Sequence, residues 1–163
     1  MERNVKKEIL RNNKQFSKMN ALYHRLSQKF EISNSESEIL YYLVSSEKDV
    51  PIQEIIYFTC SPKQTVNSAL RNMEKKEWIT LKKIDSKSKL VCLTEKGKKQ
   101  AEITVEKILA IEEQIFSSFE QEKVEEYLQF ANEFSNKLED KLKELEESYE
   151  DSVKWSFYIS KNI

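Results

Sequence analysis

Apolar side chains recur every three or four residues along most of this chain of 163 residues, a spacing that places them on one face of a helix. The stripes predict six helices, over about residues 4–30, 36–46, 51–60, 61–76, 95–119 and 121–147. Pro51 is expected in the first turn of the third helix, where its missing N–H donor costs nothing. The pattern assigns no structure to residues 149–163.

The pattern changes between the fourth and fifth predicted helices, where two short runs are rich in β-branched, aromatic and aliphatic residues. These runs cover residues 78–84 and 89–93 and flank a polar turn at residues 85–88. Together they predict a β-hairpin. Thr94 follows directly and is expected to cap the fifth helix.

Two helix starts carry capping signals. Ser35 and Glu38 have the spacing of a capping box, in which each side chain satisfies a free backbone donor. Ser61 is expected to cap the fourth helix, with Pro62 at its first helical position and Gln64 completing the box.

The fourth helix is expected to have two contrasting faces. Its buried stripe contains Val66, Ala69, Leu70 and Met73. The opposite face is polar and contains Gln64, Asn67, Ser68, Arg71 and Lys75. The second and third predicted helices lead into this polar-faced fourth helix, and a basic hairpin follows it. This is the order of elements in a winged helix-turn-helix.

Charge is unevenly distributed along the chain. The whole chain has a net charge of −1, but residues 61–99 carry eleven Lys/Arg against four acids and have a net charge of +7. Residues 112–151 carry fourteen acids against four lysines. Clustered cations release counterions from DNA, so the local charge favours nucleic-acid binding although the total does not.

The polar face of the fourth helix and the hairpin carry side chains suited to DNA. Gln64 and Asn67 can pair with adenine edges, and Arg71 can pair with guanine or hold a phosphate. The hydroxyl-bearing residues Ser61, Thr65 and Ser68 could donate to phosphates. Lys87 and Lys89 would lie near the hairpin tip, within reach of the minor groove or the backbone.

The segments 61–79 and 85–99 resemble the recognition helix and wing of MarR-family transcription regulators. The resemblance implies a mainly α fold with a small β-hairpin wing, in which long N- and C-terminal helices form a homodimer. It divides the chain into an N-terminal dimerisation helix (1–30), a winged helix-turn-helix DNA-binding domain (31–99), and C-terminal dimerisation helices with a tail (100–163). The DNA contacts expected from the residues and the resemblance together are Ser61, Lys63, Gln64, Thr65, Asn67, Ser68, Arg71, Lys75, Lys87 and Lys89.

Two positions depart from the family pattern. Glu77 stands where the family usually has a glycine that ends the recognition helix in a left-handed conformation. Lys87 stands where the family wing commonly has arginine, so the planar fork that suits a narrow groove is lost. The only glycine, Gly97, matches the family segment that opens the helix after the wing.

The chain is expected to be cytoplasmic, because it shows neither an apolar run long enough to cross a bilayer nor the apolar core of a signal peptide. The resemblance further implies a repressor that binds double-stranded DNA at a pseudo-palindromic operator. It implies a small aromatic or phenolic effector in the crevice between the dimer helices and the winged domain. No cofactor and no metal are expected. No membrane partner is expected either, because no apolar run approaches the ~20 residues that cross a bilayer. An enzyme is not expected, because the sequence has no nucleophile–base pair, phosphate loop or metal cluster.

Other residues with possible chemistry have simpler interpretations. Cys60 and Cys92 are expected to be small buried apolar side chains, with redox sensing at Cys60 as a minority hypothesis. His24, the sole histidine, is expected to be a packed or capping residue. The alternative function is a winged-helix protein that acts as a protein-interaction or effector-sensing module with weak or no specific DNA binding.

Overall fold

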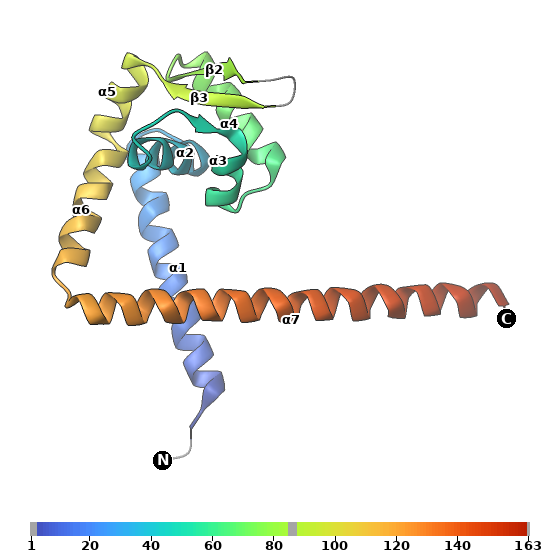
Figure 1. Cartoon of the computed structure of the whole chain (residues 1–163). Helices are drawn as coiled ribbons and strands as arrows, with labels where there is room; N and C mark the ends of the chain where they lie inside the picture. Colours follow the sequence, from blue (N-terminus) through green and yellow to red (C-terminus); the bar gives the residue numbers. More distant parts are fainter. Residues whose placement is uncertain (1–2, 85–87, 163) are drawn as a thin grey trace. The chain divides into compact units, whose positions relative to one another are not determined.

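The computed structural model describes residues 3–84 and 88–162, with side chains described up to residue 149. The elements follow in the order α1 (Val5–Lys29), α2 (Asn34–Ser45), β1 (Val50–Pro51), α3 (Ile52–Thr59), α4 (Lys63–Lys75), β2 (Ile79–Lys83), β3 (Lys89–Leu93), α5 (Glu95–Ile103), α6 (Val105–Ser117) and α7 (Gln121–Asn162) (Figure 1). The prediction of a mainly helical winged helix-turn-helix with long terminal helices is confirmed. The chain forms two compact units, Met1–Glu112 and Glu113–Ile163.

The start of α2 differs from the prediction. Ser33 caps the helix, and its Oγ accepts the backbone N–H of Glu36 at 3.2 Å, while Glu36 Oε2 accepts the backbone N–H of Ser33 at 2.9 Å. The prediction of a box at Ser35 and Glu38 is therefore wrong by two residues. Both pairs have the same spacing, and burial of Ile32 and Glu36 places the helix start at the earlier pair.

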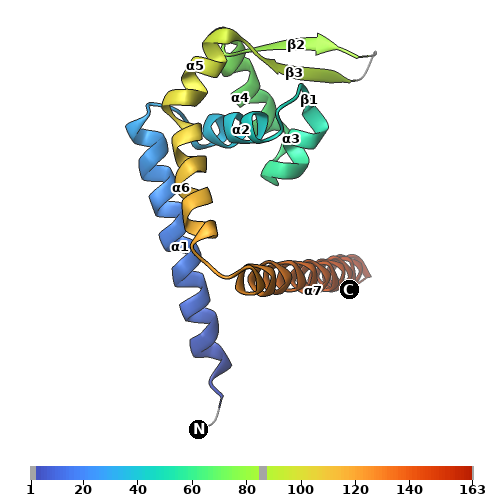
Figure 2. The same cartoon turned by 60° about the vertical axis from the view of Figure 1, so that its left-hand side comes forward.

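A short strand precedes α3 and was not predicted. Pro51 lies in an extended conformation before the helix rather than in its first turn, and Val50 pairs with Val91 of β3. The three antiparallel strands are ordered β1-β3-β2 (Figure 2). Two residues are too few to produce the alternating pattern from which a strand is predicted.

The start of α4 also differs from the prediction. Pro62 occupies the cap position, without a side-chain hydrogen bond, and the Ser61 hydroxyl instead donates to the carbonyl oxygen of Thr59 at 3.3 Å. Cys60 ends α3 with a left-handed φ of 48°, so the two helices are joined by a tight turn that takes up Ser61. Cys60 is exposed in this turn and Cys92 is buried, so the prediction of a buried side chain is wrong for Cys60 and confirmed for Cys92. The predicted buried stripe of α4 is confirmed, because all four of its residues are buried.

Glu77 ends α4 as a glycine would. Its φ is 62°, and its N–H donates to the carbonyl of Glu74 at 3.0 Å, while the N–H of Trp78 donates to the carbonyl of Met73 at 2.9 Å. This pair of hydrogen bonds is the Schellman motif. The chain then enters the predicted hairpin, and Thr94 caps α5 by accepting the N–H of Gly97 at 3.0 Å.

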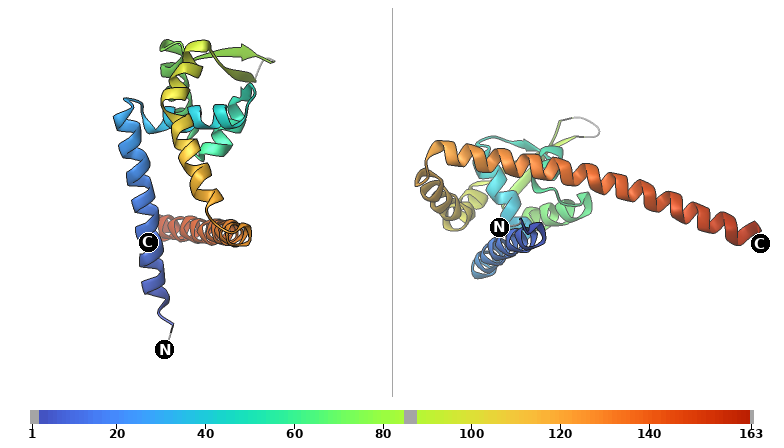
Figure 3. Two further views of the ribbon diagram at one scale, coloured as in Figure 1. Left: turned by 90° about the vertical axis from the view of Figure 1, so that its left-hand side faces the viewer. Right: turned by 90° about the horizontal axis from the view of Figure 1, so that it is seen from below.

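One long helix was predicted after Thr94, but the structure has two. Thr104 separates α5 from α6 with φ −124° and ψ −91°, and its buried hydroxyl donates to the carbonyl of Gln100 at 2.6 Å. A threonine hydroxyl that binds the preceding turn offers the backbone an alternative to the helix ladder. Considered alone, α7 is a single helix that extends beyond the predicted residue 147 (Figure 3).

The core of the first unit joins the helix-turn-helix to the sheet. Its fully buried side chains come from α2, α3, α4 and the three strands and are continued by α5 and α6. They include Ile39, Leu40, Ile55, Leu70, Met73, Ile79 and Val91. Because the inner face of α4 is fixed in this core, its opposite face is turned to solvent.

Candidate nucleic-acid interface

The outer face of α4 is available to a ligand along its whole length. Lys63, Gln64, Thr65, Arg71 and Lys75 are exposed, and Asn67 and Ser68 are half-buried. The structure therefore brings seven of the ten predicted DNA contacts onto one helix. An exposed polar helix that projects from a rigid core has the form needed to enter a major groove.

Arg71 is held in place by its own helix. Its Nη2 donates to Ser68 Oγ at 3.1 Å, one turn earlier. A guanidinium has five N–H donors, so the remaining donors can meet a base edge or a phosphate. The contact with Ser68 reduces the rotational freedom that Arg71 would lose on binding.

A polar hollow of about 460 Å³ separates the start of α2 from α4. Its polar lining comprises Ser33, Ser35, Gln64, Thr65, Ser68 and Asn72. The first turn of α2 has backbone N–H groups without helical partners, which favour anions. Ser35 and Asn72 were not among the predicted contacts, because only the fold brings the start of α2 beside α4.

The hairpin contributes two lysines opposite one another. Lys83 and Lys89 are cross-strand partners at the last described pair of the ladder. Like charges in such positions repel each other, so an anion between them would be stabilising. Lys83 was not among the predicted contacts, and the register of the strands identifies it. Lys87 lies outside the described residues.

Ion pairing divides the basic residues of this region into two groups. Four lysines form ion pairs with carboxylates: Lys76 with Glu36 at 2.7 Å, Lys82 with Asp49 at 3.2 Å, Lys96 with Glu77 at 2.9 Å and Lys98 with Glu95 at 2.8 Å. The other described cations between residues 61 and 99 form no ion pair with a described residue; they are Lys63, Arg71, Lys75, Lys83, Lys89 and Lys99. The uncompensated positive charge therefore lies on α4, on the hairpin and in α5.

A partly buried ion pair connects the end of α4 to α2. The Glu36 side chain is 4% exposed and accepts from Lys76 Nζ, which also lies 4.4 Å from the centre of the Trp78 ring. Burial disfavours the Glu36 carboxylate, but the Lys76 ammonium and the Ser33 N–H outweigh it and hold the pKa of Glu36 below its usual value. This contact links the cap of α2 to the last turn of α4.

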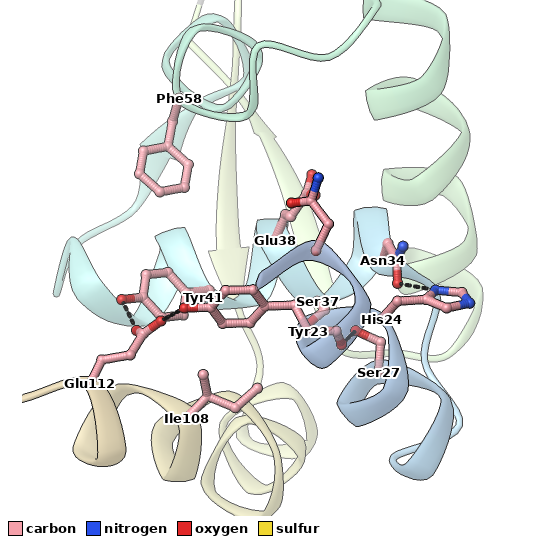
Figure 4. Close-up of a pocket in the computed structure, with 11 residues that line it drawn as sticks. Tyr23, His24, Ser27, Asn34, Ser37, Glu38, Tyr41, Phe58, Ile108 and Glu112 are labelled. Carbon is pink, nitrogen blue, oxygen red and sulfur yellow. Dashed lines mark hydrogen bonds between the residues drawn. The ribbon is translucent and has the colours of Figure 1, made fainter. Parts of the chain in front are cut away.

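A second cavity lies in the first unit, away from the outer face of α4. This pocket of about 580 Å³ is lined by residues of α1, α2, α3 and α6 (Figure 4). The hydroxyls of Tyr23 and Tyr41 both donate to the carboxylate of Glu112, the second at 2.6 Å to Oε2. His24 Nδ1 lies 3.1 Å from Asn34 Oδ1, so the sole histidine contacts the first residue of α2.

The described residues contain neither a membrane span nor a metal cluster. No helix among them is both long and apolar enough to cross a membrane. Within the same residues, no group of three or more His, Cys, Asp or Glu side chains could hold a metal ion. The polar hollow beside α4, the pocket of the first unit and the basic surface are candidate sites in the described part of the chain.

The fold and the basic surface define a winged helix-turn-helix. No family model and no curated protein matches the sequence. One similar structure is S. aureus MepR in a DNA complex, which is 22% identical with a TM-score of 0.61; the match covers 77% of this chain and 93% of MepR. Another is a MarR/EmrR-family regulator from Acinetobacter sp. ADP1, which is 22% identical with a TM-score of 0.64; the match covers 85% of this chain and 99% of that regulator. NadR in complex with 4-hydroxyphenylacetate is also similar, with 15% identity and a TM-score of 0.62; the match covers 82% of this chain and 93% of NadR.

The chain therefore has the fold of MarR-family transcription regulators over most of its length. Two further similar structures are also described as transcription regulators or members of the MarR family.

Proposed function

We propose that this protein is a sequence-specific DNA-binding transcription regulator. It acts as a homodimer on a pseudo-palindromic operator, as a repressor whose binding is modulated by a small ligand. The observation that carries the proposal is the outer face of α4, where exposed base-reading side chains stand beside cations that have no ion-pair partner among the described residues. The DNA complex of the similar MepR supports it.

The proposed contacts divide into two classes. Gln64, Asn67 and Arg71 read base edges from the major groove. Phosphate contacts come from α4 and the wing, through Ser61, Lys63, Thr65, Ser68, Lys75, Lys87 and Lys89. Ser61 is the weakest of these, because its hydroxyl must leave the Thr59 carbonyl before it can donate to a phosphate.

The homodimer is supported by apolar side chains exposed along the terminal helices. They include Ile9, Phe16 and Leu22 of α1 and Tyr127, Phe134, Leu138 and Leu142 of α7. A stripe of this length exposed to water is typical of an interaction surface. We assign residues 1–30 and 100–163 to dimerisation and residues 31–99 to DNA binding. A two-fold axis then places the two copies of α4 about one turn of DNA apart.

Regulation by a ligand is supported by the pocket of the first unit. Its volume of about 580 Å³ suits a small molecule, and Tyr23, Tyr41 and Phe58 give it aromatic walls. The pocket borders α2, which packs against α4. A ligand that changes the position of α2 therefore alters how α4 is presented to DNA.

The experiment measures the DNA affinity of two alanine variants by fluorescence anisotropy. Each variant is titrated with a duplex from the DNA that flanks the gene and with a scrambled duplex of the same composition. Arg71→Ala is expected to lose discrimination between the duplexes, while Lys89→Ala weakens both alike. Lys96→Ala is the matched control, because Lys96 pairs with Glu77 and is expected to change neither. Equal loss of discrimination in the first two variants contradicts the division into base and phosphate contacts.

The alternative is a winged-helix module for protein interaction or effector sensing without specific DNA binding. It drew on the departures at Glu77 and Lys87. Glu77 now gives no reason for it, because the helix end is formed with the same hydrogen bonds that a glycine permits.

A further inference from the structure

The pocket of the first unit is acidic. Its lining contains two carboxylates, Glu38 of α2 and Glu112 of α6, and no lysine or arginine among the described residues (Figure 4). A small anion that entered it would meet two negative charges without a basic partner. In a partly desolvated cavity such repulsion is stronger than in water.

The two carboxylates differ in how they are satisfied. Glu112 accepts hydrogen bonds from the hydroxyls of Tyr23 and Tyr41, which fix its position. Glu38 forms no hydrogen bond or ion pair with another described residue. The protein atoms around Glu38 raise the pKa of its carboxyl, although the side chain keeps contact with solvent. A positive charge beside Glu38 would stabilise its ionised form.

The pocket walls favour a flat organic body. Phe58 lines the pocket and stacks on Tyr42 with ring centres 4.3 Å apart, which holds its ring in place. Tyr23 and Tyr41 add two further rings. Aromatic faces attract cations through their quadrupole, and they stack on planar groups. The walls and the carboxylates therefore select the same kind of molecule.

We propose that the effector is an organic cation with a planar apolar body, whose positive group is bound beside Glu38 and over the aromatic rings. This inference rests on the proposed ligand regulation and names the chemical class of the ligand. It separates this chain from NadR, whose bound 4-hydroxyphenylacetate carries a carboxylate.

The test uses three bicyclic probes of similar size and different charge: N-methylquinolinium, naphthol and naphthoate. Each is titrated into the full chain by calorimetry at about pH 8. We expect the cation to bind at least about tenfold more tightly than the anion. Glu38→Gln should lower the affinity for the cation about tenfold, which corresponds to about 1.4 kcal/mol, and change the affinity for naphthol less than about twofold.

Glu102→Gln is the matched control, because Glu102 is an exposed α5 residue outside the pocket lining, and it should leave all three affinities unchanged. The proposal is overturned if naphthoate or 4-hydroxyphenylacetate binds as tightly as the cation, if Glu38→Gln leaves cation binding intact, or if no probe binds. Anisotropy with duplex DNA is measured on the same samples. If salt-sensitive DNA binding is intact in any of these cases, the proposed ligand class is wrong but the proposed function as a DNA-binding regulator is not contradicted.

Discussion

Gly97 is the position where a single methyl group should do the most damage to the wing. A Cβ atom added there would lie 1.9 Å from the carbonyl oxygen of Trp78 and 2.8 Å from its carbonyl carbon. Both are backbone atoms at the start of the hairpin, so no side-chain rotation relieves the clash. Gly97→Ala must therefore move α5 away from the hairpin.

The cost follows from the contacts at that carbonyl. The Trp78 oxygen accepts the N–H of Thr94 at 3.0 Å, and the clash displaces this donor. The Thr94 hydroxyl lies 3.2 Å from the same oxygen but donates to the nearer carbonyl oxygen of Glu77 at 2.6 Å. One hydrogen bond at about 1 kcal/mol, added to about 1–3 kcal/mol for overpacking, gives a decrease of about 2–4 kcal/mol in the free energy of unfolding.

Urea denaturation followed by circular dichroism measures this decrease. Lys99→Ala on the same helix is the control, because Lys99 is exposed and forms no ion pair with a described residue, and it should change the stability by less than about 0.5 kcal/mol. A Gly97→Ala protein as stable as the control would refute the close approach of α5 to Trp78.

Three further outcomes test other contacts. Glu77→Gly should raise the melting temperature by about 2–4 °C, as measured by scanning calorimetry, because glycine adopts the left-handed φ of 62° without the steric strain of a Cβ atom. The lowered pKa of Glu36 means that its ionised form stabilises the fold above the ordinary value of 4.5. Urea melts should lose this stability as the pH falls below that value, and Glu36→Gln should flatten the loss. Tyr41→Phe should cost about 1–2 kcal/mol by removing the hydrogen bond to Glu112, while Tyr57→Phe, 87% exposed, should cost almost nothing in the same melts.

Sequence pattern located the helical segments and the hairpin, but not the strand β1, the division into α5 and α6 or the exact helix starts. The buried stripe of α4 follows directly from its three-four spacing, and so does the polar face opposite it. Ser33 and Ser35 both begin a capping box, so spacing could not choose between them. Burial of Ile32 and Glu36, which is a tertiary property, decides the choice. The break at Thr104 likewise depends on a buried hydroxyl that no periodicity reveals.

The candidate interface shows the same division. The polar residues of α4 could be selected from sequence because helix periodicity places them together. The sequence could not show which lysines are available to bind phosphate. Lys82 is paired with Asp49 and Lys96 with Glu77 through contacts that form only in the fold. Lys83 required the strand register.

The salt dependence of DNA binding tests the central claim most directly. Affinity for promoter DNA from the gene's own neighbourhood is measured over a range of salt concentrations for the native protein, Lys75→Ala and Lys96→Ala. Native affinity should fall steeply with salt, and Lys75→Ala should reduce the slope by about 0.9 for each phosphate that is no longer neutralised. Lys96→Ala should leave the slope unchanged, because Lys96 is paired with Glu77. Absence of salt-sensitive binding to any such DNA would contradict the account.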